Sequence, residues 1–113
     1  MLSILAVDDD QGVCDFLSAA LTEAGYAATC VQTFAAAAER LDRDRFDFLM
    51  ADVRLPDGRG SDLVEKAEAG GAKTLLFAGY IEEIALLPQQ GAPHLAKPFR
   101  LQELTRALER LRP

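Results

Sequence analysis

The fold is decided by residues 46–58, which read FDFLMADVRLPDG. The stretch opens with an apolar run, Phe46 to Ala51, which predicts a short buried strand ending at Asp52. The tetrapeptide Leu55-Pro56-Asp57-Gly58 follows, and it has strong turn chemistry because proline presets one turn dihedral and glycine accepts a positive φ. We therefore predict a strand, a carboxylate at its carboxyl end, and a loop.

The rest of the chain alternates short apolar runs with longer amphipathic segments. Further strands are predicted at residues 2–7, 26–31, 73–78 and 94–96. Helical spacing of apolar residues predicts helices at 13–24, 34–42, 61–69, 80–87 and 101–111. This strand–helix unit, repeated along the chain, predicts an α/β fold: a parallel sheet with helices on both faces.

Length and charge limit the function classes. The 113 residues predict one domain, spanning 1–113, which is long enough to bury a core without metal or disulfide staples. The formal net charge is −6, so we expect protein partners or a small cationic ligand and no direct contact with nucleic acid, whose phosphates would repel the chain. The sequence has no signal-peptide pattern and no apolar run of membrane-spanning length, which favours a cytoplasmic protein without membrane contact.

The sequence contains only two cysteines, Cys14 and Cys30, and they do not form a CxxC pair. Both have apolar neighbours. In a reducing compartment such residues are usually buried free thiols, and that is our expectation here in preference to a disulfide.

Charged residues follow three of the predicted strands. Asp8, Asp9 and Asp10 come after the first strand, Asp52 after the third, and Lys97 after the fifth. Ligands of open parallel sheets bind at the carboxyl ends of the strands, so these side chains are the candidate site. Asp10 is more simply explained as the N-cap of the following helix.

Several carboxylates at one point repel each other, and a bound cation relieves that repulsion. Hard oxygen ligands with open positions suit Mg²⁺, and a phosphoryl oxygen can fill one of those positions. Lys97 would add a positive charge opposite the carboxylates. The set favours attack by Asp52 on a phosphoryl donor, although these residues alone leave simple Mg²⁺ binding open.

Three motifs together resemble the response-regulator receiver domains of two-component signalling. They are Val7-Asp8-Asp9-Asp10, the segment from Asp52 to Gly60, and Lys97-Pro98-Phe99. The resemblance covers essentially the whole chain. It implies a three-layer, doubly wound, five-stranded parallel sheet of strand order 2-1-3-4-5, the flavodoxin-like arrangement.

The resemblance also implies a role for each site residue. Asp52 matches the phosphoacceptor, and Lys97 matches the lysine that contacts the phosphoryl group. Asp9 and Asp52 match direct Mg²⁺ ligands, the backbone carbonyl of Arg54 matches a third, and Asp8 acts mostly through water. Such a domain is not an enzyme apart from its own phosphorylation and dephosphorylation.

Two positions depart from the family pattern. Ala78 stands where the family has Ser or Thr at the end of strand four, and a register slip would not supply a hydroxyl because Thr74 is four residues upstream. His94 stands where the family often has Tyr or Phe. We expect phosphorylation chemistry to survive while the switch built on Ala78 and His94 is atypical. His94 itself is expected to be a partly buried structural histidine.

Further expectations follow from the resemblance. The bond from Lys97 to Pro98 is usually cis in the family. Side chains at the positions of Arg54 and Tyr80 tend to control water access, so a bulky Tyr80 predicts slow self-dephosphorylation.

Two alternatives remain. Asp8-Asp9-Asp10 also contains the Asp-x-Asp spelling of haloacid-dehalogenase-like phosphohydrolases, in which Asp8 would be the nucleophile. Against that reading, Gly12 stands where those enzymes have Thr or Val, and the chain is short for their fold. The other alternative is a degenerate receiver that binds proteins without phosphorylation.

The expected partners are a histidine kinase or histidine phosphotransfer protein and a downstream protein target. The target would contact the face that includes Glu82, Glu83, His94, Arg100 and Arg106. We expect a monomer or weak dimer. If the chain is complete, it lacks an output domain and acts by contact or passes phosphate onward; if it is a fragment, it belongs to a larger regulator or kinase.

Overall fold

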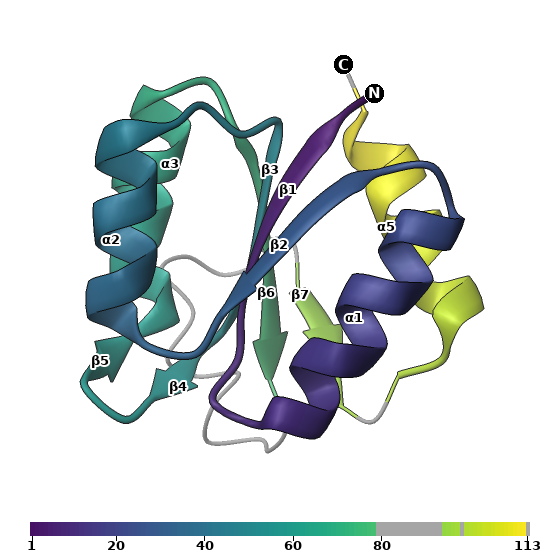
Figure 1. The fold of residues 1–113 in the computed structure, drawn as a ribbon, viewed down its shortest axis with the longest axis horizontal. Helices are drawn as coiled ribbons and strands as arrows, with labels where there is room; N and C mark the ends of the chain where they lie inside the picture. The colour runs from purple at the N-terminus through teal and green to yellow at the C-terminus, as the bar shows by residue number, and fades with distance from the viewer. Residues whose placement is uncertain (79–93, 98, 113) are drawn as a thin grey trace.

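A computed structural model describes residues 1–78, 94–97 and 99–112, and its centre is a parallel sheet (Figure 1). The strands of the sheet are β1 (Ser3–Val7), β2 (Ala27–Val31), β3 (Phe48–Asp52), β6 (Lys73–Ala78) and β7 (His94–Ala96). Their order across the sheet is β2-β1-β3-β6-β7, and every pairing is parallel. Numbered as strands of this sheet alone, that order is the expected 2-1-3-4-5.

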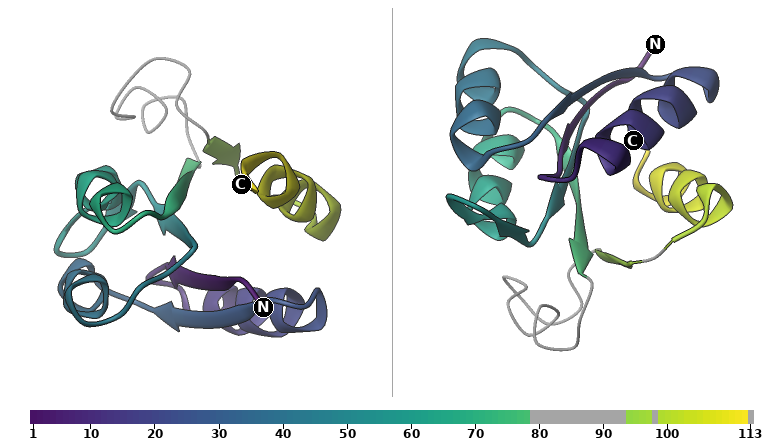
Figure 2. Two further views of the ribbon diagram at one scale, coloured as in Figure 1. Left: turned by 90° about the horizontal axis from the view of Figure 1, so that it is seen from above. Right: turned by 60° about the horizontal axis from the view of Figure 1, so that its bottom comes forward.

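Helices cover both faces of the sheet. The helices are α1 (Gln11–Glu23), α2 (Phe34–Arg43), α3 (Val64–Ala69) and α5 (Leu101–Leu111). Figures 1 and 2 show α2 and α3 on one face and α1 and α5 on the other. The three-layer arrangement predicted from the alternating pattern is confirmed. Among the described residues, no helix has the length and apolar character needed to cross a bilayer.

Two apolar clusters lie on the two faces of the sheet. One joins Leu5, Val7 and Leu49 to Ala37 of α2 and Ala67 of α3. The other joins strand residues of the opposite face to helices α1 and α5. Its fully buried members are Ile4, Phe48, Met50, Phe77, Leu17, Leu21, Leu104 and Leu108. Because both faces of the sheet are covered, the strand sequences are continuous apolar runs and do not alternate between apolar and polar residues.

Most element boundaries lie within two residues of the predicted ones. α1 begins earlier than the apolar spacing indicated, because the Asp10 side chain accepts hydrogen bonds from the amides of Gly12 and Val13 and so caps the helix. The helix predicted from Ser61 begins instead as a short 3-10 turn, Gly60–Leu63, that leads into α3. The helix predicted at 80–87 lies outside the described residues.

The predicted loop after Asp52 contains a small two-stranded ribbon. Arg54–Leu55 (β4) pairs antiparallel with Gly58–Arg59 (β5), with Pro56 and Asp57 between them. Figure 1 shows this ribbon beside the lower end of α2. The turn chemistry was therefore located correctly, but the short strands beside it were not predicted.

The expectation of free thiols is wrong. Cys14 of α1 and Cys30 of β2 form a disulfide, with their Cα atoms 5.7 Å apart. Helix α1 packs over the side of the sheet to which Cys30 points, which brings together two residues 16 positions apart in the sequence. Nothing in the local sequence around either cysteine indicates this pairing.

Candidate functional site

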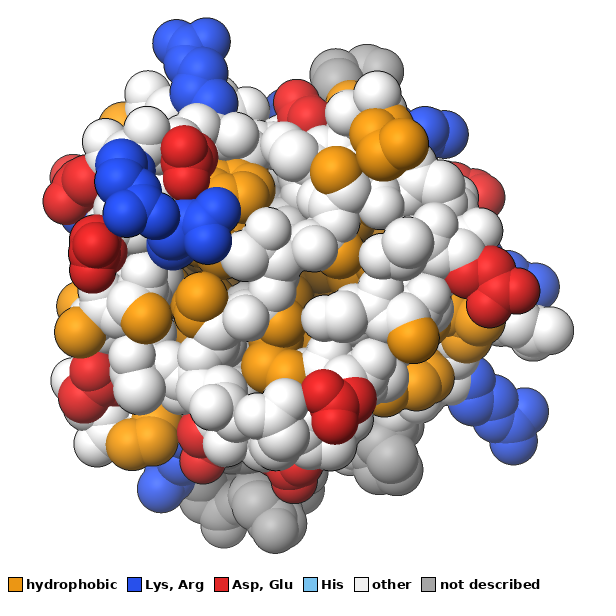
Figure 3. Space-filling model, viewed as in Figure 1, with side chains coloured by type: hydrophobic (Ala, Val, Ile, Leu, Met, Phe, Trp, Pro, Cys, Tyr) orange, Lys and Arg blue, Asp and Glu red, His pale blue; other side chains and the backbone are white. Residues whose placement is uncertain are grey.

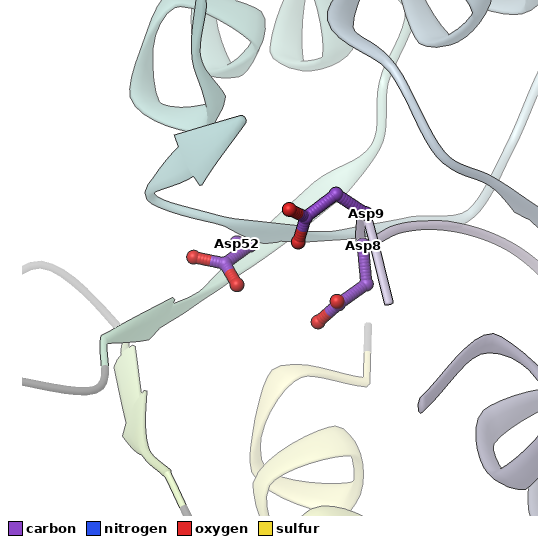
Figure 4. Close-up of side chains that lie close together, drawn as sticks. All are labelled: Asp8, Asp9 and Asp52. Atoms are coloured by element: carbon purple, nitrogen blue, oxygen red, sulfur yellow. The ribbon is translucent and has the colours of Figure 1, made fainter. Parts of the chain in front are cut away.

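The strand order places the two acidic segments side by side. β1 and β3 are neighbours, and Val7 is paired with Ala51, the residues just before Asp8 and Asp52. Parallel strands end at the same edge of the sheet, so Asp8 and Asp52 emerge next to each other. Asp9 extends from the same β1–α1 connection (Figure 4).

The three carboxylates form one cluster. Asp8, Asp9 and Asp52 each contribute an oxygen, and these oxygens all lie within 4.8 Å of one another. Figure 4 shows the three carboxyl groups turned toward the same space at the end of β3. Asp8 is fully buried and Asp52 is 7% exposed, whereas Asp9 is exposed. The cluster thus has a buried floor and a side open to solvent.

Lys97 supplies the opposing charge. Its Nζ donates to Oδ2 of Asp8 and to Oδ2 of Asp52, at 2.6 Å in each case. The residue follows β7, and its amide donates to the carbonyl of Ala78 at 3.0 Å, which extends the pairing of β6 with β7 by one residue. The lysine therefore bridges two carboxylates that come from different strands.

Burial and the hydrogen-bonded partners shift the pKa values of Asp52 and Lys97 in opposite directions. Burial raises the pKa of the Asp52 carboxyl above its ordinary value, and this exceeds the lowering by the hydrogen bonds from Lys97 and the Arg54 amide. Burial alone would lower the pKa of the Lys97 ammonium, but its hydrogen bonds to Asp52 and Asp8 outweigh this and raise that pKa. Lys97 is therefore held in its charged form.

The donor set fits a small divalent cation. All three side chains offer hard carboxylate oxygens, the ligands that Mg²⁺ prefers. Two oxygens bound directly to one Mg²⁺ lie at most about 4.2 Å apart, since each bond is about 2.1 Å. The three oxygens lie within 4.8 Å of one another, which is compatible with a set in which all bind one ion after small side-chain movements or in which one acts through water.

The ribbon after β3 fixes the backbone around Asp52. The Arg54 amide donates to Oδ1 of Asp52 at 3.0 Å, which orients the carboxyl group. Gly60 packs directly beneath Asp52: a Cβ at this position would lie 2.0 Å from the Asp52 carbonyl oxygen. Only glycine fits this contact, and its role was not predicted from the sequence.

A second contact holds the far end of the ribbon. The Asp57 carboxylate accepts hydrogen bonds from the amides of Phe34 and Ala35 at 2.8 and 3.0 Å, at the N-terminus of α2. These bonds, that of Ala35 foremost, lower the pKa of Asp57. The sequence identified Asp57 only as a turn residue, because its partner amides are 22 and 23 residues away.

The two proposed switch positions lie in adjacent strands. Ala78 is buried at the end of β6 and pairs in register with Ala96, while His94 pairs with Leu76. His94 is exposed, so the expectation of a partly buried histidine is wrong. Tyr80, which is expected to slow self-dephosphorylation, and the Lys97–Pro98 bond, which is expected to be cis, involve residues outside the described ones, as do Glu82 and Glu83.

Comparison with known proteins gives one consistent result. The family model described as response regulator receiver domain matches residues 4–109. The response regulator receiver protein CpdR of Brucella abortus (strain 2308) is 34% identical over 116 residues, which cover 98% of this chain and 97% of that protein. The chain also matches longer regulators, of which it spans between 25% and 49%.

Solved structures agree with the sequence comparison. A CheY-like response regulator receiver domain protein from Methanospirillum hungatei JF-1 superposes with a TM-score of 0.86 at 27% identity, over 97% of this chain and 92% of that one. The receiver domain of sensor histidine kinase PA1611 from Pseudomonas aeruginosa PAO1 gives a TM-score of 0.85 at 27% identity, over 97% and 96%. That structure has a magnesium ion coordinated in its active site cleft.

Proposed function

Since this chain belongs to the family of response regulator receiver domains, we propose that it accepts a phosphoryl group on Asp52 in a Mg²⁺-dependent reaction. The observation that carries the proposal is the lysine bridge. Lys97 lies 2.6 Å from both Asp8 and Asp52, at the one point where three carboxylates converge among the described residues. A phosphoacceptor site needs this combination of a carboxylate nucleophile, a cation site and a fixed positive charge.

In this proposal the Mg²⁺ ligands are Asp9, Asp52 and the Arg54 backbone carbonyl, with Asp8 acting through water. The ion would offset negative charge on the transferring phosphoryl group and its acceptor. Asp9 is the exposed member of the set, so it lies where an arriving donor and ion enter.

The chain's own residues prepare the nucleophile. The Arg54 amide holds Oδ1 of Asp52, and Lys97 holds Oδ2. One carboxylate oxygen of Asp52 attacks phosphorus, and the bond between phosphorus and the donor's histidine nitrogen breaks. The nitrogen keeps the bonding electron pair. Lys97 already lies beside the acceptor oxygen, so it can pair with the new phosphoryl oxygens without a long movement.

The output of this chemistry is proposed to be atypical. Ala78 has no hydroxyl with which to bind a phosphoryl oxygen, and His94 is already exposed. The coupled switch, in which a hydroxyl moves to the phosphate and a ring then moves inward behind it, therefore lacks its first part, because Ala78 supplies no hydroxyl. We expect the phosphorylated protein to signal through a smaller or differently placed change.

The proposed partners follow from the same reading. A histidine kinase or histidine phosphotransfer protein supplies the phosphoryl group, and a downstream protein, not a nucleic acid, receives the signal. The net charge of −6 supports a protein partner. We propose that the chain is one domain, a monomer or weak dimer, and acts in the cytoplasm.

The test is the intact mass after incubation with acetyl phosphate and Mg²⁺. Wild type should gain about 80 Da, the mass of one phosphoryl group, and Asp52→Asn should gain nothing. Asn keeps the shape of Asp52 and removes its charge, so the pair isolates the nucleophile. If folded wild type is labelled neither by acetyl phosphate, nor by phosphoramidate, nor by a phosphorylated histidine phosphotransfer protein, the proposal is contradicted and a phosphorylation-independent binding module replaces it.

A further inference from the structure

The disulfide touches the backbone of the acidic site. Cys14 Sγ lies 3.5 Å from the Asp8 carbonyl oxygen and 3.8 Å from the Val31 carbonyl oxygen, and Cys30 Sγ lies 3.9 Å from the latter. The Asp8 amide donates to that same Val31 carbonyl at 3.0 Å. The two sulfur atoms therefore lie where β1 passes into the segment that carries Asp8 and Asp9.

The disulfide holds this segment at both ends. On one side, Asp8 continues β1, which is paired residue by residue with β2 up to Val7 and Val31. On the other side, Asp10 caps α1, and Cys14 is in the first turns of that helix. The bond from Cys14 to Cys30 thus ties α1 to β2 across the connection formed by residues 8–10.

The bond is reachable from solvent. Cys14 and Cys30 both line an open hollow of about 370 Å³, together with Gln11, Gln32, Thr33 and Ala36. The Gln32 side chain donates to that of Gln11 at 3.1 Å on its rim. Cys14 is 4% exposed while Cys30 is only half-buried, so Cys30 is the more exposed residue of the pair. Figure 3 faces edge strand β2 and shows apolar side chains between the two helix layers.

Disulfides of proteins in reducing compartments are usually transient and redox-sensing, whereas structural ones are typical of secreted proteins. The proposed cytoplasmic function, together with an accessible bond beside the acidic site, favours the first kind. We propose that Cys14–Cys30 is a reversible disulfide, exchanged through Cys30 by a dithiol reductant, whose redox state controls how firmly the Asp8–Asp10 segment is held.

Reduction of the disulfide takes two successive thiol–disulfide exchanges. A thiolate of the reductant attacks Cys30 Sγ, the bond to Cys14 breaks, and the Cys14 thiolate takes up a proton. The second thiol of the reductant then displaces Cys30, which also ends as a thiol, and the reductant becomes a disulfide. Two electrons and two protons pass to the protein. In the reduced state no covalent cross-link ties α1 to β2, and only the backbone of residues 24–26 joins them.

The first experiment measures the thiol state of the native, full-length protein. Oxidised protein should take up no alkylating reagent, and after incubation with dithiothreitol it should take up two alkyl groups by intact mass. Re-oxidation with oxidised glutathione should reverse the change. The proposal is overturned if both thiols stay free after the oxidant, or if the bond resists the reductant until the protein unfolds.

The second experiment measures amide hydrogen exchange by NMR in both redox states, without added metal. The Asp8 amide should exchange at least about tenfold faster after reduction, because its hydrogen bond to Val31 loses the adjacent tie. The Lys73 amide, which bonds to Asp47 at the opposite end of the sheet, is the reference. Equal acceleration of both amides would mean that the bond only staples the whole fold, and would overturn the proposed coupling.

The control is the double variant Cys14→Ala/Cys30→Ala, whose exchange should not respond to reductant. If that variant does not fold, the comparison of the two redox states of wild type still decides the question.

A third measurement rests on the proposed function: Mg²⁺ titrated into both redox states should bind several-fold more weakly to the reduced form, and equal affinities would overturn control of the metal site. If neither form binds Mg²⁺, the metal site of the proposed function fails, while the alkylation and exchange results still decide the redox proposal.

Discussion

At the scale of single residues, Lys97 offsets the negative charge of two buried carboxylates. It bridges Asp8 and Asp52, two carboxyl groups that are at least nine-tenths buried, at 2.6 Å each. Without it, two carboxylates would remain close together in a poorly solvated place, where repulsion and burial both favour protonation. The lysine is therefore proposed both to keep Asp52 ionised and to stabilise the transferring group.

Replacing Lys97 with Met should slow labelling of Asp52 by acetyl phosphate roughly 100-fold, the usual effect of removing one charge-stabilising donor. The rate is read from the intact mass over time. Lys97→Arg is the matched control, because it keeps the charge and should retain more of the rate. An unchanged rate in Lys97→Met would remove Lys97 from the proposed mechanism.

The lowered pKa of Asp57 predicts that the stability of the fold depends on pH. The pKa of Asp57 is lowered in the folded state by hydrogen bonds from the Ala35 and Phe34 amides, so its ionised form stabilises the fold. That stabilisation is present above the ordinary value of 3.8 and is lost as the pH falls through the lowered folded value. Asp57→Asn should therefore be less stable than wild type at pH 7, with the difference shrinking below about pH 4.

Urea unfolding of both proteins between pH 7 and pH 3 measures this difference. Glu68→Gln, which neutralises an exposed carboxylate near the end of α3, is the control and should show a smaller pH-dependent difference. If the difference between wild type and Asp57→Asn is constant over the whole pH range, the α2 cap does not depend on the charge of Asp57.

At the scale of elements, the β4–β5 ribbon connects the site to the helices. One end is tied to Asp52 through the Arg54 amide, and the other is tied to α2 through Asp57. Gly60 follows the ribbon and leads toward α3. Its amide donates to the Val53 carbonyl at 2.9 Å, and the residue packs against the Asp52 backbone. A change in the ribbon should therefore be felt at Asp52.

Gly60→Ala tests this connection. The added Cβ would lie 2.0 Å from a backbone oxygen, which cannot move as a flexible side chain would. We expect a loss of about 3 kcal/mol in the free energy of unfolding, measured by urea denaturation, and slower labelling of Asp52. Gly70→Ala is the control, because its nearest contact would be an ordinary 3.5 Å and its φ is negative. Equal stability of the two variants would contradict the close packing at Gly60.

At the scale of the whole molecule, the proposed cation site makes the stability of the folded state depend on a bound cation. The chain carries −6 overall, and three of its carboxylates are held within 4.8 Å of one another. A cation that binds the folded state and not the unfolded chain must stabilise the fold by mass action. The proposed Mg²⁺ site can thus be tested without any phosphoryl donor.

Mg²⁺ at about ten times its Kd should raise the free energy of unfolding by about 1.4 kcal/mol. The measurement is thermal or urea unfolding with and without Mg²⁺ at constant ionic strength. Asp9→Asn should reduce the effect, while Asp15→Asn, an exposed carboxylate on α1, should keep it. If Asp9→Asn responds to Mg²⁺ as wild type does, Asp9 is not a ligand.

The sequence by itself determined the fold class and which residues end the strands. Apolar runs and helical spacing depend on neighbours a few residues apart, so the strands at 73–78 and 94–96 and the helix at 101–111 were predicted with their observed bounds. The motifs also named Asp8, Asp9, Asp52 and Lys97, which the structure brings together.

Only the tertiary structure decided the contacts between distant segments. The Cys14–Cys30 bond, the exposure of His94, the cap that Asp57 gives α2 and the contact of Gly60 with Asp52 each depend on how elements pack in space. Periodicity records which face of an element is apolar, but it does not record which residue of another element that face will meet. For this reason the sequence supplied the residues of the site, and the packing of α1, α2 and the ribbon supplied what holds them in place.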